Sequence, residues 1–402
     1  MDRRQFLNRG AAGLGAMALG PVGGFAAPSE SDLKITEVTT YLLKDALLVK
    51  LKTDSGIEGW GECERGVAST IEELLYTEAA PYVLGEDPFQ STSALYDFFY
   101  REHDQLGGTL AGAIAGLDIA MWDLKARILD VPIWRLLGGQ YRDRMNIYGS
   151  YATDRWRKMG PKEAADVALK FVRRGFDTVK CRMQVRESAL DPREDRTVEY
   201  IAAIKKKVPN DIEVFTDINN GYSVKRAILI GQELHDRFGM KYFEEPCSDQ
   251  NHSNTRKVAE ALPMYIIAGE KEYTPFQLQE MVTYADPDYL NPDVIKHMGI
   301  TGMQRAGIIS QLNQKPIIVH NTRPTVSTAA SLQLAASYPI IGPFMEYPDE
   351  DKFPRLLDIM KEPFQIDGSV MMVPQGPGLG IEIDEAEVQD QARQVRTRTL
   401  EE

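Results

Sequence analysis

From Met145 to Glu346 the chain repeats one pattern of hydrophobic and polar positions. Each repeat begins with a short apolar run that ends in a polar or charged residue, and a segment with helical spacing follows. The runs predict β-strands and the segments between them predict helices. The predicted strands are Met145–Tyr148, Asp177–Arg182, Glu213–Asp217, Lys241–Glu244, Tyr265–Glu270, Tyr289–Asp293, Pro316–His320 and Gly342–Glu346. This even alternation predicts an α/β fold built on a TIM-type (β/α) barrel.

Two of the predicted helices have clear boundaries. Pro161 suits the first helical position and Gly175 favours a helix end, so one helix is predicted over Pro161–Arg174. Another is predicted over Thr197–Lys207. Both lie between consecutive strands, as the barrel repeat requires.

The chain before the barrel has a different pattern, which predicts a separate α+β domain. Apolar and polar residues alternate from Leu33 to Glu62 around a turn at Thr53–Gly56, which predicts an antiparallel meander. Apolar residues three and four positions apart then predict helices at Thr70–Leu84, Ser91–Phe99 and Thr109–Leu129.

These patterns divide the chain into four segments. Residues 29–140 are predicted to form a domain that caps a mouth of the barrel, and residues 141–360 to form the barrel. Residues 361–402, with the apolar run Val370–Val373, are predicted to return to the capping domain and add a strand or edge there. The remaining segment, residues 1–28, has a composition of its own.

The first residues are typical of an export signal. Arg3 and Arg4 precede Phe6 and Leu7, and an Ala/Gly/Leu-rich segment follows as far as about Ala27. That segment is too short and too rich in glycine to span a bilayer. It predicts a twin-arginine signal peptide and a mature protein in the periplasm, with a disordered cytoplasmic tail as the alternative.

Composition narrows the classes of partner. The 402 residues are 43% hydrophobic, and 46 Lys and Arg against 59 Asp and Glu give a net charge of −13. Without a basic block, nucleic acid and anionic membrane surfaces are not expected partners. The three cysteines, Cys63, Cys181 and Cys247, do not make a disulfide framework and are expected to be buried small hydrophobes.

Three consecutive predicted strands end in carboxylates, at Asp217, Glu244 and Glu270. The strands of a parallel barrel bring their ends together at one rim. Acids gathered there repel one another unless a positive charge cancels the repulsion. A hard divalent cation with oxygen ligands would do so, and Mg²⁺ is the first choice.

Other polar residues at the same rim suggest acid–base chemistry. Lys180 and Arg182 are two positions apart on one strand, so both side chains face the barrel mouth while Cys181 faces the helices. Asp293 ends the strand beside the one that ends in His320, and a neighbouring carboxylate fixes the tautomer of an imidazole and raises its basicity. With one metal the site would be slightly positive, which suits a substrate carboxylate.

As a set, these residues resemble the enolase superfamily, in its mandelate racemase-like subgroup. The resemblance rests on Lys180-x-Arg182, Asp217-x-Asn219, Glu244-Glu245-Pro246, Gly269-Glu270, Asn291-Pro292-Asp293, Gly299–Gly302, His320 and Glu346, with Gly59–Glu62 and Gly116–Asp123 in the capping domain. It covers the whole chain after the signal, and the ordered set is specific although each motif alone is weak. It implies a modified (β/α)7β barrel with a capping domain that the C-terminal segment completes.

The resemblance also implies a role for each site residue. Asp217, Glu244 and Glu270 would ligate Mg²⁺, and His320 with Asp293 would be the general base or acid, consistent with the superfamily's use of a Lys or His base beside the metal. Glu346 would hydrogen-bond a substrate carboxylate oxygen if its pKa is raised, with an ion-pair role as the alternative. Asn219 would orient groups around the metal, and Glu245 is expected to form an ion pair rather than a metal bond.

One position departs from the racemase-like pattern, which usually has Lys-x-Lys on the second strand. Arg182 replaces the second lysine, and a guanidinium is too basic to accept a proton. Racemisation needs a base on each face of the carbon, and one base is missing here. Lys180 is therefore expected to hold the substrate carboxylate, and the hypothesis is a lyase, a Mg²⁺-dependent acid-sugar dehydratase that forms a 2-keto-3-deoxy acid.

Two alternatives remain open at this point. The first is a racemase, epimerase or cycloisomerase of a carboxylate, and the second is a binding protein for acid sugars that has lost turnover. In every case the expected partner is a small-molecule carboxylate. Whether the chain forms a homo-oligomer is left open. The segments 43–46, 64–70 and 151–159 should select the substrate through Lys44, Arg65, Arg155 or Arg157, which the sequence does not rank.

Overall fold

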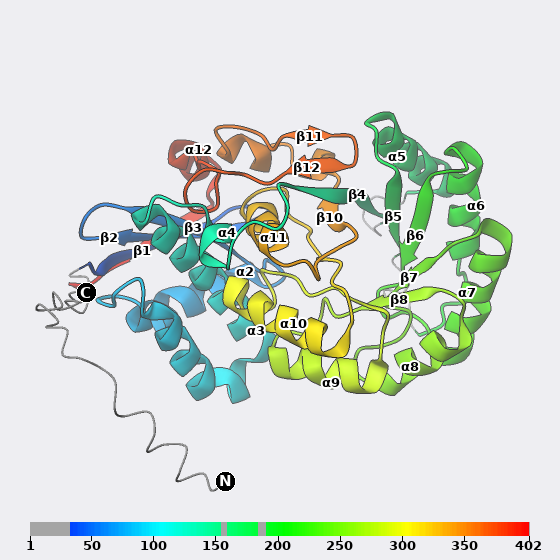
Figure 1. Ribbon diagram of the computed structural model, residues 1–402, viewed down its shortest axis with the longest axis horizontal. Helices are drawn as coiled ribbons and strands as arrows, with labels where there is room; N and C mark the ends of the chain where they lie inside the picture. The colour runs from blue at the N-terminus through cyan, green and yellow to red at the C-terminus, as the bar shows by residue number, and fades with distance from the viewer. Residues whose placement is uncertain (1–32, 154–158, 184–189, 402) are drawn as a thin grey trace, which may run out of the picture. The chain divides into compact units, whose positions relative to one another are not determined.

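The computed structural model describes residues 33–153, 159–183 and 190–401, apart from the side chains of residues 91–94, 100 and 102–107 (Figure 1). The predicted signal peptide, residues 1–28, lies outside this range. Residues 33–402 form one unit by their internal contacts. Figure 1 shows the blue N-terminal strands beside the red C-terminal strand, and the green barrel strands flanked by helices.

The predicted meander forms an antiparallel sheet in the capping domain. Its strands are β1 (Ile35–Leu42), β2 (Leu47–Thr53) and β3 (Glu58–Cys63). The C-terminal strand β13 (Gln394–Thr399) pairs antiparallel with β1 and completes the order β13-β1-β2-β3. The chain therefore does return to the capping sheet, as the sequence predicted.

A single helix, α3 (Ser91–Ile128), replaces the two helices predicted over Ser91–Phe99 and Thr109–Leu129. The predicted break is wrong because a glycine between them serves packing rather than termination. A Cβ added at Gly108 would lie 2.8 Å from the ring of Tyr273, so only glycine lets the helix pass this ring.

The helix predicted over Thr70–Leu84 is divided into three parts. These are α2 (Ala68–Leu74), a π-helical turn (Leu75–Ala79) and a 3-10 turn (Ala80–Tyr82). Pro81 is the second residue of the last turn and has no N–H group, so α-helical bonding cannot continue through it. A short helix, α4 (Ile133–Leu136), leads from α3 into the barrel.

The barrel follows the predicted alternation. Its named strands are β4 (Arg144–Thr153), β5 (Thr178–Met183), β6 (Glu213–Asp217), β7 (Tyr242–Glu244), β8 (Tyr265–Ala268), β9 (Tyr289–Leu290) and β10 (Met345–Pro348). Neighbours from β4 to β9 are parallel in chain order, and β10 pairs with β4 to close the ring. The helices are α5 (Pro161–Arg173), α6 (Thr197–Lys207), α7 (Val224–Phe238), α8 (His252–Ala261), α9 (Pro275–Ala285), α10 (Gly299–Asn313) and α11 (Val326–Ser337).

The seventh predicted strand, Pro316–His320, makes only isolated parallel bridges. Ile317 bridges to Leu290 of β9 and to Ile341, which precedes β10, and His320 bridges to Asp293. Pro292 and Pro316 have no N–H group, which interrupts the ladder of hydrogen bonds on this side of the barrel. The bridge at His320 nevertheless fixes its backbone beside that of Asp293.

The run Val370–Val373 does not join the capping domain, which corrects the prediction for it. Its strand β12 (Val370–Met372) pairs with β4 of the barrel and with β11 (Ile366–Asp367). Met371 is fully buried there, and a short apolar run carries no signal for which sheet it joins. The return occurs further along, through α12 (Glu385–Gln391) and β13.

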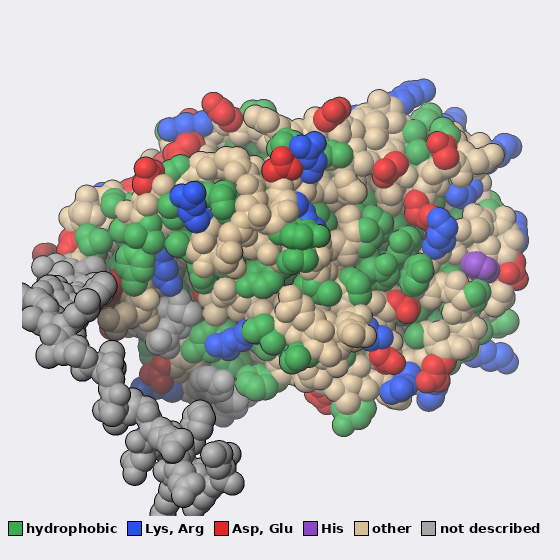
Figure 2. All heavy atoms as spheres, in the orientation of Figure 1, with side chains coloured by type: hydrophobic (Ala, Val, Ile, Leu, Met, Phe, Trp, Pro, Cys, Tyr) green, Lys and Arg blue, Asp and Glu red, His purple; other side chains and the backbone are tan. Residues whose placement is uncertain are grey.

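Two hydrophobic clusters support these two parts. One fills the barrel and the space under its helices, and the other lies between the capping sheet and α3. On the face shown in Figure 2, acidic and basic side chains are interspersed. Within the described residues, none of the helices is both long and apolar enough to cross a bilayer.

Candidate active site

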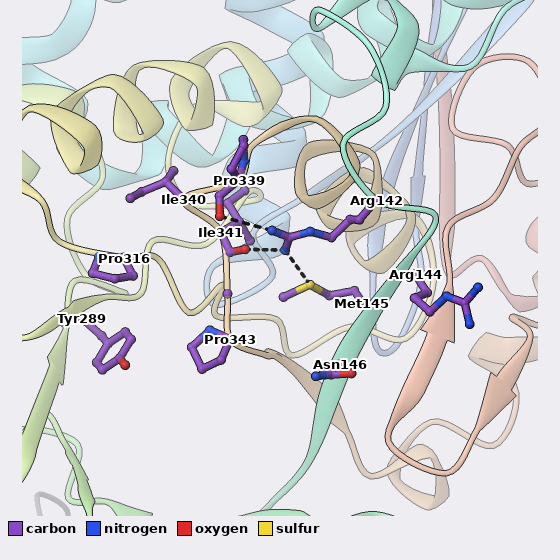
Figure 3. Close-up of a pocket in the computed structure, with 11 residues that line it drawn as sticks. Arg142, Arg144, Met145, Asn146, Tyr289, Pro316, Pro339, Ile340, Ile341 and Pro343 are labelled. Atoms are coloured by element: carbon purple, nitrogen blue, oxygen red, sulfur yellow. Dashed lines mark hydrogen bonds between the residues drawn. The ribbon is translucent and has the colours of Figure 1, made fainter.

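A cavity of about 790 Å³ lies where the barrel strands end, and the capping segment around Arg65 forms part of its wall. The predicted site residues that line it are Lys180, Arg182, Asp217, Glu270, His320 and Glu346. Three further site residues are buried behind this lining, and each is hydrogen-bonded to a residue that lines the cavity. Glu244 bonds to Lys180, Asn219 to Asp217, and Asp293 to His320. A second pocket, of about 540 Å³, surrounds Arg142 at the opposite end of the barrel and contains none of these residues (Figure 3).

The three predicted metal ligands share one buried region. Asp217, Glu244 and Glu270 are at most 6% exposed. Asn219 connects two of them, because its Nδ2 donates to Asp217 Oδ2 and to Glu270 Oε1, both at 3.3 Å. The Asn219 backbone N–H also donates to Asp217 Oδ1 at 2.6 Å. Asn219 thus holds two of the predicted metal ligands beside each other, and its expected role in orienting groups around the metal stays a prediction.

Positive side chains pair with two of these acids. Lys180 Nζ lies 2.8 and 2.9 Å from the two carboxylate oxygens of Glu244. Burial raises the pKa of Glu244 to about 8, although Lys180 opposes this shift. Glu270 pairs with His320 Nε2 and with Lys271, and these charges outweigh burial and hold its pKa well below the ordinary value.

The acids and the neighbouring amide fit a magnesium ion by their chemistry. Carboxylate and amide oxygens are the hard ligands that Mg²⁺ prefers. The Oδ1 atom of Asn219 is buried without a partner among the described residues. Within the described ranges, no group of three Asp, Glu, His or Cys side chains is arranged as metal ligands would be. The reason is that Glu244 is turned toward Lys180 and Glu270 toward His320. Binding a metal would therefore exchange these pairings for metal–oxygen bonds.

His320 is held by acids at both ring nitrogens. Its Nδ1 is 2.6 Å from Asp293 Oδ2, and its Nε2 faces Glu270 and lies 3.7 Å from Glu346 Oε2. Burial opposes a charge on the ring, but Glu270 and the other acids raise the pKa of His320 to about 10. The predicted contact between Asp293 and His320 is present, and it leaves Nε2 directed toward the cavity.

Glu346 lies between the histidine and the lysine. One of its oxygens is 3.1 Å from Lys180 Nζ, and the other faces His320. The expectation of a raised pKa at Glu346 is wrong here, because Lys180 and His320 outweigh burial and lower it. Glu346 is therefore an anionic acceptor in this arrangement, the ion-pair role that the sequence left as an alternative.

The alternation predicted along β5 is present. Lys180 and Arg182 both line the cavity, whereas Cys181 is buried and outside its lining. Lys180 is 1% exposed and lies 5.4 Å from the ring centre of Tyr148. Arg182 is half-buried, and its Nε is buried without a partner among the described residues.

Several polar residues at the site were given no role from the sequence. Asn291 Nδ2 donates to Glu244 Oε1 at 3.2 Å, and Lys296 Nζ lies 3.7 Å from Glu270 Oε2. Asn291 belongs to the Asn-Pro-Asp motif, which was a usable signal. Lys296 follows in a loop and had no such signal. Glu245 forms an ion pair with Lys271, as expected.

Two family models match the chain. The model "Mandelate racemase / muconate lactonizing enzyme, N-terminal domain" matches residues 29–138, and the model "Enolase C-terminal domain-like" matches residues 163–387, more than half of the chain. The fold and the acidic site define the class as an enolase-type barrel enzyme. The chain belongs to the mandelate racemase/muconate lactonizing enzyme family of the enolase superfamily.

Solved structures of relatives agree with this assignment. The mandelate racemase/muconate lactonizing protein from Paracoccus denitrificans PD1222, complexed with magnesium, is 26% identical with a TM-score of 0.83, over 92% of this chain and 100% of its own. A protein from Zymomonas mobilis ZM4, provisionally named a dehydratase, is 23% identical (TM-score 0.81; 91% and 100% covered). The 3,6-anhydro-D-galactonate cycloisomerase from Zobellia galactanivorans is 23% identical (TM-score 0.77; 90% and 99% covered). The last two show the shared fold only.

Three predictions from the sequence are confirmed by these comparisons: the superfamily, the capped (β/α) barrel, and Mg²⁺ as the cofactor. The chemistry common to the superfamily is Mg²⁺-dependent abstraction of a proton next to a carboxylate. The chain is an enzyme of this type.

Proposed function

We propose that this enzyme dehydrates an acid sugar to a 2-keto-3-deoxy acid. The observation that carries the proposal is the single acid–base centre: the His320–Asp293 pair lines a cavity in which Arg182 stands at the position of a second base, next to Lys180. A dehydratase needs one base for the α-proton, and the arginine offers no second one.

Some of the site residues would bind the metal and the substrate, and others would transfer the proton. Asp217, Glu244 and Glu270 would hold Mg²⁺, which when bound withdraws electron density from the substrate carboxylate and makes the neighbouring C–H bond more acidic. Lys180 faces the region where negative charge develops on that carboxylate. One charge pair at about 4 Å contributes roughly 4 kcal/mol at an effective dielectric of about 20.

His320 would move the proton. Neutral imidazole Nε2 removes the hydrogen from the carbon next to the carboxylate, while Asp293 stabilises the imidazolium through Nδ1–H. The imidazolium then donates this proton to the departing β-hydroxyl, which leaves as water. The resulting enol takes a proton from solvent at the next carbon and releases its hydroxyl proton to solvent, which gives the 2-keto-3-deoxy acid. Proton transfer by such a group contributes about 10²–10⁴-fold to the rate.

The second candidate is an isomerase, favoured by one relative that is named a cycloisomerase. Lys180 would then serve as the base opposite His320. Against this, Lys180 is buried between Glu244 and Glu346, and these acids raise its pKa well above the ordinary value despite burial. Glu346 is not a predicted metal ligand, so its pairing with Lys180 at 3.1 Å would remain when Glu244 binds the metal. A lysine paired with a carboxylate stays protonated and binds an anion rather than accepting a proton.

The test is a set of mono- and diacid sugars incubated with the protein and Mg²⁺. Formation of 2-keto acid supports dehydration, and its loss on chelation of the metal supports the metal's role. Deuterium incorporation next to the carboxylate without loss of water would support the isomerase instead. The His320→Asn variant serves as the control, because a protein that turns over equally well without the imidazole would contradict the mechanism.

A further inference from the structure

The wall of the active cavity carries positive charge beyond the lysine assigned to the reacting carboxylate. Lys180 lies deep in the barrel, between Glu244 and Glu346. Arg323 and Arg65 also line the cavity, but neither touches the predicted metal ligands. Arg323 follows His320 by three residues, and Arg65 comes from the capping domain.

Arg323 is buried with a hydrogen-bond donor left over. Its side chain is 5% exposed, and its Nε is buried without a partner among the described residues. Nη1 donates to the carbonyl oxygen of Thr322 at 2.6 Å, and the guanidinium carbon lies 5.4 Å from the ring centre of Phe353. A buried donor without an acceptor lowers the stability of the folded protein, and a ligand that brings an acceptor to this donor would recover that free energy.

Arg65 adds a like charge close to this guanidinium. Burial lowers the pKa of Arg323, and the next largest cause is the repulsion from Arg65. Glu62 and Glu64 oppose the shift. The Glu62 Oε2 atom accepts hydrogen bonds from the Ser327 N–H and the Thr325 hydroxyl, and its Oε1 atom is buried without a partner among the described residues. Two neighbouring guanidinium groups at a cavity wall favour an anion between them.

We propose that Arg323 and Arg65 bind a second anionic group of the substrate, at the end distant from the reacting carboxylate. The inference rests on the proposed function and narrows it to polyhydroxy acids with an anion at both ends. The planar guanidinium group matches the two oxygens of a carboxylate or a phosphate. Lys180 and Arg323 line the same cavity, and its volume of about 790 Å³ is large enough for such a molecule.

Three acids of equal chain length and configuration test this directly. One ends in a hydroxymethyl group, one in a carboxylate, and one in a phosphate monoester. Binding is measured by calorimetry with Mg²⁺ in a His320→Asn background, and kcat/KM in the active protein. The variants are Arg323→Gln, Arg323→Lys and Arg65→Gln. Arg142→Gln is the matched control, because Arg142 is a partly buried arginine at the opposite end of the barrel (Figure 3).

The parent should bind one of the two doubly anionic acids more tightly than the acid with a neutral end. The anion carried by the preferred acid, carboxylate or phosphate, is then the group that Arg323 and Arg65 bind. In Arg323→Gln the preference should fall about tenfold to a hundredfold, the worth of a charge-assisted bond. Arg323→Lys should lose less, and Arg65→Gln less than Arg323→Gln, because Arg65 is more exposed and pairs with Asp45 at 3.2 Å. Arg142→Gln should keep the parental preference.

Two results would overturn the inference while leaving the dehydratase in place: a parent that dehydrates the acids without preferring an anionic end, or an Arg323→Gln variant that weakens all three acids equally. If the active protein dehydrates none of the three acids, the proposed function fails and this inference fails with it.

Discussion

Among the individual residues, Glu270 is a predicted metal ligand that would have to give up a pairing with the catalytic histidine when a metal binds. It is paired with His320 and Lys271, and its neighbour Asp217 is tied to Asn219. Metal ligation by Glu270 would release His320 from this pair and leave the ring free to act as a base. The same carboxylate therefore links metal binding to the state of the histidine.

The first prediction concerns Asp217. Asp217→Asn keeps the shape of the side chain but removes one anionic ligand, so Mg²⁺ affinity should fall at least tenfold, the lower limit seen for changes around metal ligands. Calorimetric titration with Mg²⁺ alone measures this without turnover. Asp211→Asn, the same change at an exposed position before β6, should leave the affinity unchanged. Equal affinities in the two variants would remove Asp217 from the metal site.

The second prediction concerns pH and His297. This histidine is 0% exposed, its Nδ1 lies 2.6 Å from the Glu272 carbonyl oxygen, and burial lowers its pKa to about 4. The unfolded chain binds a proton near pH 6.5, before the folded protein does. Stability should therefore be lost as pH falls from about 6.5 to 4, by up to roughly 3 kcal/mol from this residue.

Denaturant unfolding at several pH values measures this loss. In His297→Gln the free energy of unfolding should vary less steeply between pH 6.5 and 4. His235→Gln is the matched control, because His235 also faces a backbone carbonyl, that of Met240, but is partly exposed. Identical slopes in the parent and His297→Gln would show that His297 is not the residue responsible.

At this scale the sequence predicted which residues meet, since Asp217, Glu244, His320 and Glu346 each end a predicted strand of one barrel. It did not predict charge states. The pKa of Glu346 depends on its distances to Lys180 and His320, which spacing along the chain does not contain. Nor could it rank the capping cations: Arg65 lines the cavity, Lys44 is exposed outside the lining, and Arg155 and Arg157 lie outside the described residues.

Among the elements, β3 and α3 make the closest contact in the capping domain. A Cβ added at Gly61 on β3 would overlap the backbone carbonyl oxygen of Gly116 on α3. Neither backbone has room to move, because both elements contribute to a buried core. The glycines therefore set how closely this helix lies on the sheet.

The third prediction follows from this contact. Gly61→Ala should lower the free energy of unfolding by about 1–3 kcal/mol, the usual cost of overpacking. Urea unfolding measures the change. Gly66→Ala is the control, because its added Cβ would meet only the flexible end of Glu64 at 3.3 Å. Similar destabilisation in both variants would mean that the close approach of β3 and α3 is not the cause.

Elements with a strong period were predictable, and those decided by tertiary contacts were not. Helix Thr197–Lys207 has the predicted bounds. Pro316–His320 fails to form a continuous strand because its own proline and that of its neighbour interrupt the ladder. Val370–Met372 joins β4 rather than the capping sheet because burial of Met371 decides its place.

At the scale of the whole molecule, buried carboxylates fasten the capping domain to the barrel. Asp118 of α3 accepts hydrogen bonds from the backbone N–H of Thr301 at 2.8 Å and from its hydroxyl at 2.5 Å, at the start of α10. Glu62 of β3 accepts the Ser327 N–H at 2.9 Å, at the start of α11. These contacts hold the segment that carries Arg65 over the cavity.

The fourth prediction tests this attachment. Asp118→Ala leaves the Thr301 donors buried without an acceptor, so the free energy of unfolding should fall by about 1–3 kcal/mol. Thermal and urea unfolding measure the effect. Asp97→Ala, on the same helix but exposed and paired with Arg101, should cost less than about 1 kcal/mol. Equal effects would show that Asp118 does not fasten the two parts.

The most direct measurement of the central claim is turnover of acid sugars with Mg²⁺ in D₂O, followed by NMR. Removal of the α-proton by His320 and loss of the β-hydroxyl predict a 2-keto-3-deoxy acid with one solvent deuterium at carbon 3, and neither product nor exchange in His320→Asn. Product formation by His320→Asn at the parental rate, or deuterium at carbon 2 of unchanged acid without loss of water in the parent, would contradict the account.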